Sequence, residues 1–72
     1  MKRCKLLRMM SGKTQAVAAK DMGMHVSSLS SIETGRLRPY PGQVRKIAAA
    51  LGWEGDPAEL FEEVSADEIR TA

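Results

Sequence analysis

The chain has 72 residues, of which 43% are hydrophobic and one is a cysteine. This length allows one small domain, and the apolar fraction excludes a disordered chain. A single cysteine excludes a disulfide framework. Beside a single histidine it leaves no second thiol for a cysteine-based zinc site, so we expect neither a metal nor a cofactor. Because so small a core stabilises a domain only marginally, we expect all-helical packing with short loops, or dimerisation.

The net charge of +2 conceals an uneven distribution of charge along the chain. Residues 1–46 hold ten Lys and Arg against two Asp and Glu, a balance of +8. Residues 47–72 hold one Arg against seven Asp and Glu, a balance of −6. A basic front attracts phosphate, and an acidic rear discourages the opposite face from doing so. The pattern favours a nucleic-acid binder, with ordinary solvated charge as the alternative.

Residues 2–11 are predicted to form a first helix. Cys4 and Leu7 share one face of this helix, with Arg8 beside them. Three further apolar residues lie round the side: Leu6, Met9 and Met10. They either extend the small core or form a contact face for a partner or a second subunit.

The basic beginning of the chain resembles that of a signal peptide but lacks its apolar run. Arg8 interrupts that run, and Gly12 and Lys13 end it. No segment approaches the roughly 20 apolar residues of a membrane span. We therefore expect a soluble, cytoplasmic protein with no membrane partner.

Two short helices joined by a tight turn are predicted between Thr14 and Gly35. Thr14 can cap the first of them, and the second spans residues 26–33. Helical spacing places two apolar pairs inward, Ala18 with Met22 and Leu29 with Ile32. Gly23 supplies the left-handed residue that the turn needs, and the small Ala19 allows a close crossing of the helices. Together these features predict a helix-turn-helix.

The remainder of the chain predicts a loop and two further helices. Residues 34–40 form the loop, and Pro41 opens a fourth helix that Gly52 ends. The inward stripe of this helix is Val44, Ile47, Ala48 and Leu51. Asp56, Pro57 and Glu59 form the start signal of a short fifth helix, which holds Leu60, Phe61 and Val64. We expect one domain over residues 1–64 and a short acidic tail, residues 65–72, that frays or forms one further turn capped between Ser65 and Glu68.

The helix-turn-helix stretch resembles that of phage Cro proteins and repressors, and of the bacterial regulators named after the xenobiotic-response-element regulator. The residues that carry the resemblance are Arg8, Gly12, Thr14, Gln15, Ala19, Gly23, Leu29, Ile32, Glu33, Gly35, Pro39, Ile47, Ala48, Ala50, Leu51 and Gly52. The resemblance implies an all-α fold, a compact bundle of about five short helices like the lambda-repressor DNA-binding domain. It also implies a structural ion pair between Arg8 and Glu33.

The resemblance implies in addition how the protein meets double-stranded DNA. The helix over residues 26–33 enters the major groove, where Val26, Ser27 and Ser31 stand at the base-contacting positions. The residues expected to contact the DNA backbone are Lys13, Thr14, Gln15, Ser28, Ser30, Arg36, Arg38 and Gln43. Serine pairs with any base, so either the DNA is read partly through its shape, or the groove contact has decayed and another role dominates.

Taken together, the sequence predicts a DNA-binding transcriptional regulator, a repressor that acts as a homodimer. Four residues of the rear half supply the dimer interface: Trp53, Leu60, Phe61 and Val64. The alternative for Leu60 and Phe61 is that they only close the core. The alternative function is a helix-turn-helix interaction module with weak DNA readout, such as an antitoxin or a phage accessory protein, whose main partner is another protein. We expect no enzyme, because the chain offers no nucleophile with a base, no carboxylate pair in a predicted cleft and no phosphate-binding loop.

Overall fold

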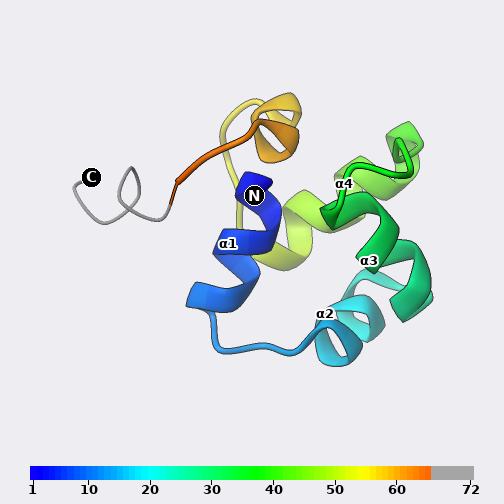
Figure 1. The fold of residues 1–72 in the computed structure, drawn as a ribbon. Helices are drawn as coiled ribbons and strands as arrows, with labels where there is room; N and C mark the ends of the chain where they lie inside the picture. The colour runs from blue at the N-terminus through cyan, green and yellow to red at the C-terminus, as the bar shows by residue number, and fades with distance from the viewer. Residues whose placement is uncertain (66–72) are drawn as a thin grey trace.

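The computed structural model describes residues 1–65. Over this range the elements are α1 (Arg3–Met10), α2 (Gln15–Met22), α3 (Val26–Glu33), α4 (Pro41–Leu51) and a 3-10 helix, η1 (Pro57–Phe61) (Figure 1). The predicted all-α bundle is confirmed, and the helices lie close to their predicted positions. The predicted tail, including the turn between Ser65 and Glu68, lies outside the described residues except for Ser65 itself.

Local capping signals set the helix ends. The Thr14 Oγ1 atom accepts a hydrogen bond from the Val17 N–H at 3.2 Å, which caps α2 as expected. Asp56 Oδ1 accepts from the Ala58 N–H at 3.0 Å and opens η1. The α2 and α4 helices end at Gly23 and Gly52, whose φ angles of 69° and 67° are left-handed. These ends therefore follow directly from residue types.

The turn at Gly23 is expected to depend on its glycine. A Cβ atom there would meet only the end of the Lys46 side chain at 3.8 Å, so the cost of Gly23→Ala is the left-handed backbone itself, about 1–2 kcal/mol. The matched control is Gly42→Ala, because Gly42 lies inside α4 with open space around its Cβ position. That change should stabilise the protein by about 0.5–1 kcal/mol. Urea denaturation of both variants measures the two changes in unfolding free energy, which should have opposite signs. Equal changes would contradict the prediction.

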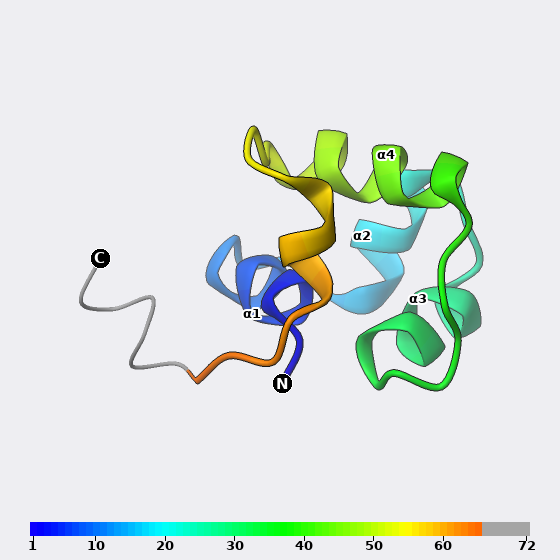
Figure 2. The same ribbon diagram turned by 90° about the horizontal axis from the view of Figure 1, so that it is seen from above.

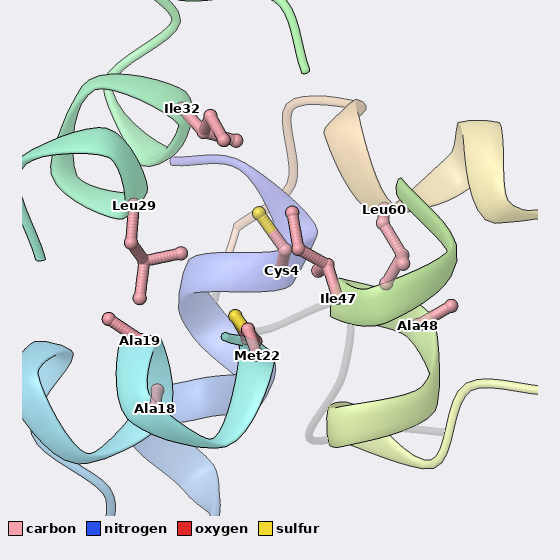
Figure 3. Close-up of a cluster of buried hydrophobic side chains, with 9 residues drawn as sticks. All are labelled: Cys4, Ala18, Ala19, Met22, Leu29, Ile32, Ile47, Ala48 and Leu60. Atoms are coloured by element: carbon pink, nitrogen blue, oxygen red, sulfur yellow. The ribbon is translucent and has the colours of Figure 1, made fainter. Parts of the chain in front are cut away.

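Residues from all five elements meet in one core (Figure 3). The helix α2 packs against both α3 and α4, and α1 packs against α4 and η1. The predicted inward residues of the helix-turn-helix, Leu29 and Ile32 among them, are buried. The core consists of Cys4, Ala18, Ala19, Met22, Leu29, Ile32, Ile47, Ala48 and Leu60. In α4 the outer members of the predicted stripe, Val44 and Leu51, are only partly buried.

The α1 helix is buried on more than the one predicted face. Leu6, which the sequence left without a place, is buried, whereas Leu7 is only partly buried. The α1 helix packs against both α4 and η1. Met9 and Met10 remain 50% and 59% exposed, so they do not extend the core.

The fifth helix differs from the prediction in type and length. It is a single 3-10 segment that ends at Phe61, and Val64 lies beyond it in extended chain. This chain runs beside the N-terminus. The Arg3 N–H donates to the Glu62 carbonyl at 2.9 Å, and the Val64 N–H donates to the Met1 carbonyl at 2.8 Å. We call residues 1–3 and 62–64 the terminal clasp. Lys2 and Glu63 form an isolated antiparallel bridge there.

The terminal clasp joins the two oppositely charged ends of the chain. Glu63 binds the Met1 amine at 3.0 Å and the Lys2 ammonium at 3.1 Å, and Glu62 binds Arg3 at 3.1 Å. At the chain ends the basic front and the acidic rear of the sequence therefore meet, and their charges are paired.

The terminal clasp is expected to make stability depend on pH. The hydrogen bond from the Met1 amine, followed by that from Lys2, lowers the pKa of Glu63 from its ordinary value of 4.5. The ionised carboxylate therefore stabilises the fold above pH 4.5, and this contribution is lost as pH falls through the lowered pKa. Glu63→Gln should unfold at a lower urea concentration than the wild type at neutral pH and at the same concentration in strong acid. Glu54→Gln is the control, and a difference that persists in acid would contradict the assignment.

Candidate nucleic-acid interface

The α3 helix lies at one edge of the bundle. Figure 2 shows it beside the loop that leads to α4, on the side away from residues 62–65. Its inward side is fixed by Leu29 and Ile32, which are buried. Val26 is 45% exposed and Ser27 is exposed, so the beginning of α3 faces solvent. The other serines of α3, Ser28, Ser30 and Ser31, are partly exposed.

A buried polar network holds the end of α3 against α1 and α2. Glu33 is only 3% exposed, and its carboxylate accepts three hydrogen bonds. Arg8 donates from Nε at 2.7 Å and from Nη2 at 3.2 Å, and Gln15 donates from Nε2 at 2.9 Å. Arg8 also donates from Nη1 to the Lys13 carbonyl at 2.8 Å. The ion pair expected between Arg8 and Glu33 is thus present within a larger network, which fixes the orientation of α3 relative to α2.

Besides Thr14, whose hydroxyl caps α2, three residues expected at the DNA backbone have partners within the protein. The Gln15 amide donates to Glu33, which leaves its second N–H and its oxygen for other contacts. The Gln43 Oε1 atom accepts from the Tyr40 N–H at 3.0 Å and so caps α4. Lys13 binds Asp21 at 2.8 Å on the surface. These residues stabilise the scaffold, and their capacity for phosphate is reduced accordingly.

The loop between α3 and α4 carries two arginines that remain available. Arg36 and Arg38 are exposed and form no ion pair within residues 1–65. The loop is tied to α3, because the Arg36 and Leu37 N–H groups donate to the Ser31 carbonyl at 2.9 and 3.2 Å. The structure therefore keeps these two cations next to the last turn of α3.

Sequence reasoning missed a third cation near α3. The Lys46 ammonium lies 3.8 Å from the position that a Cβ atom would take at Gly23, in the turn that leads into α3. Its position at the end of α2 is favourable for a cation, because the carbonyl end of a helix is negative. The residue comes from α4, so no local pattern around the turn could have indicated it.

The rear residues expected at a dimer interface divide into two kinds. Leu60 is completely buried and Val64 is buried, so these two close the interior of the protein, and a surface role for them is wrong. Trp53 and Phe61 are partly buried against the core and keep some exposed surface. The Trp53 indole N–H donates to the Asp56 carbonyl at 3.0 Å, and the Arg3 guanidinium lies 5.8 Å from its ring centroid. The tryptophan is thus fixed in orientation.

The described residues gather no metal-ligand cluster, and their one cysteine is buried. Within residues 1–65, no three His, Cys, Asp or Glu side chains gather closely enough to hold a metal ion. Burial raises the pKa of the Cys4 thiol to about 11, so the thiol stays protonated and fills space in the core. No helix in this part of the chain has the length and apolar character to cross a membrane.

The α2 helix, the glycine turn and the solvent-facing α3 define a helix-turn-helix domain, the architecture of a class of DNA-binding regulators. Comparison with protein families leads to the same class. Residues 3–61 match the helix-turn-helix domain family, and the chain belongs to this family. The comparisons with curated proteins and with solved structures found no match.

Proposed function

We propose that the protein is a cytoplasmic transcriptional repressor of the Cro and xenobiotic-response-element-regulator type, which binds DNA as a homodimer through α3. The observation that carries this proposal is the surface around α3. Val26, which is 45% exposed, and Ser27, which is exposed, lie at the beginning of the helix. Arg36 and Arg38 flank the end of the helix, and Lys46 flanks its beginning. A narrow polar helix bordered by free cations suits the major groove.

Within this proposal, base contacts come from the exposed side of α3. Val26 packs on a thymine methyl group, and Ser27 and Ser31 each form one hydrogen bond with a base edge. Because serine donates and accepts alike, most of the sequence preference arises from the shape and deformability of the site. The affinity itself rests on phosphate contacts.

The expected strength of each phosphate contact depends on whether its side chain already has a partner within the protein. Arg36, Arg38 and Lys46 form no ion pair within residues 1–65 and contribute most. Thr14, Ser28 and Ser30 add neutral hydrogen bonds, and the N–H groups that open α2 add dipole-assisted ones. Lys13, Gln15 and Gln43 contribute least, since each has a partner within the protein. The homodimer uses the exposed part of Trp53, because the exposed part of Phe61 lines an apolar groove.

A salt titration of DNA binding tests the proposal. Arg36, Arg38 and Lys46, which have no ion pair within residues 1–65, give six cations in a dimer, so the affinity should fall with roughly the fifth power of salt concentration. Fluorescence anisotropy with random duplex DNA and with DNA from the protein's own promoter measures this slope and any preference for a pseudo-palindrome. Absence of binding to both DNAs at low salt would contradict the proposal and favour a protein-interaction module.

A further inference from the structure

An apolar groove lies between the loop that follows α3, the beginning of α4 and η1. Its volume is about 570 Å³, and it is open to solvent rather than enclosed. The apolar side chains that line it are Pro39, Pro41, Val44, Ala58 and Phe61. Pro41 and Ala58 are exposed and the other three are partly exposed, so each of these side chains keeps surface outside the core.

Two arginines complete the groove. Arg38 and Arg45 also line it, are exposed, and form no ion pair within residues 1–65. A guanidinium group binds carboxylates through paired N–H donors and tolerates contact with apolar surface. The groove thus combines an apolar floor with two free cations.

We infer that this groove binds an acidic, apolar peptide segment of a partner protein. Large apolar side chains of the segment occupy the floor, and its Asp or Glu carboxylates bind Arg38 and Arg45. An apolar floor beside two arginines favours such a peptide over DNA and over a small molecule. A DNA backbone satisfies the arginines but gains nothing from prolines, valine and phenylalanine. A small molecule would be left largely in solvent, because small-molecule sites enclose most of their ligand.

The groove and the α3 surface share Arg38. If α3 binds DNA, which rests on the proposed function, a peptide in the groove withdraws one phosphate contact in each protomer. The partner then weakens DNA binding. Peptide binding itself does not depend on DNA and is measured without it.

The probe is a panel of fluorescein-labelled peptides in which Leu and Phe alternate with Glu and Asp, measured by fluorescence anisotropy on the full chain. Two control panels replace the acidic residues with Lys or the apolar residues with Ser. We expect saturable binding of the acidic, apolar peptides below about 1 mM and at least about tenfold weaker binding of both control panels. Equal binding of all three panels, or no saturable binding by any, would overturn the inference.

Two pairs of variants locate the binding. Arg45→Glu removes a groove cation, and Lys46→Glu makes the same charge change at an exposed neighbour outside the groove. Ala58→Glu places a carboxylate in the groove, and Ala49→Glu places one at an exposed site of α4 outside it. The groove variants should lose about tenfold in peptide affinity and the controls less than twofold. Equal losses within each pair would show that the peptide responds only to overall charge. Circular dichroism checks that each variant is folded.

Discussion

Replacement of Glu33 by alanine is expected to destabilise the protein by about 3–5 kcal/mol. The change leaves the Arg8 guanidinium buried with no carboxylate, and it removes the acceptor of the Gln15 amide. A domain of this length has a total unfolding free energy of about 4–11 kcal/mol, so the loss is a large share of it. Urea denaturation followed by far-ultraviolet circular dichroism measures the change.

A surface ion pair provides the control for this prediction. Lys13 and Asp21 are as close as Arg8 and Glu33, at 2.8 and 2.7 Å, but both side chains are substantially exposed. Asp21→Ala should therefore cost less than about 1 kcal/mol. If Glu33→Ala cost no more than Asp21→Ala, the buried network would not hold α3 in place.

A double replacement separates neutralisation of charge from hydrogen bonding. Arg8→Met with Glu33→Leu removes both charges and keeps apolar volume, which by itself is often neutral or stabilising. Here the Gln15 amide and the Lys13 carbonyl lose their partners as well. The double variant should accordingly recover most but not all of the stability lost in Glu33→Ala. Full recovery would indicate that only the unpaired charge mattered.

The sequence predicted the elements that depend on local chemistry. Thr14, Gly23 and Gly52 act within a few residues of their own positions, so the helix ends they set can be deduced from residue type. Leu29 and Ile32 needed only helical spacing to be placed inward. For the same reason α3 was predicted with its observed boundaries, Val26–Glu33.

The parts that the sequence could not predict depend on residues far apart in the chain. The terminal clasp joins Met1 to Val64, and no pattern at either end indicates the other. The burial of Leu6 and the position of Lys46 beside Gly23 likewise follow from how helices pack. In the interface, the family resemblance placed Gln15 at a phosphate, but its bond to Glu33 is decided by tertiary structure.

Replacement of Ser27 by glutamate is expected to weaken DNA binding by about 100-fold or more while leaving the fold intact. Ser27 is exposed in the first turn of α3, where a carboxylate favours the helix by about 0.3–1 kcal/mol. In the major groove the same carboxylate would face the negative potential of the duplex and would lack a donor at most base edges. Because stability should rise slightly, loss of binding in this variant cannot be attributed to unfolding. Anisotropy on the preferred DNA and a urea titration measure the two effects.

Two further variants show whether the effect belongs to α3. Ala49→Glu makes the same change of charge on α4 and should weaken binding only severalfold, through the net charge of the protein.

Arg38→Ala should weaken binding to preferred and random DNA alike, because a phosphate contact carries no sequence information. If α3 reads the bases as proposed, Ser27→Glu should remove the preference itself, because it blocks approach of that side of α3. If Ser27→Glu bound DNA as well as Ala49→Glu, α3 would not enter the groove, and the DNA-binding surface would have to lie elsewhere on the protein.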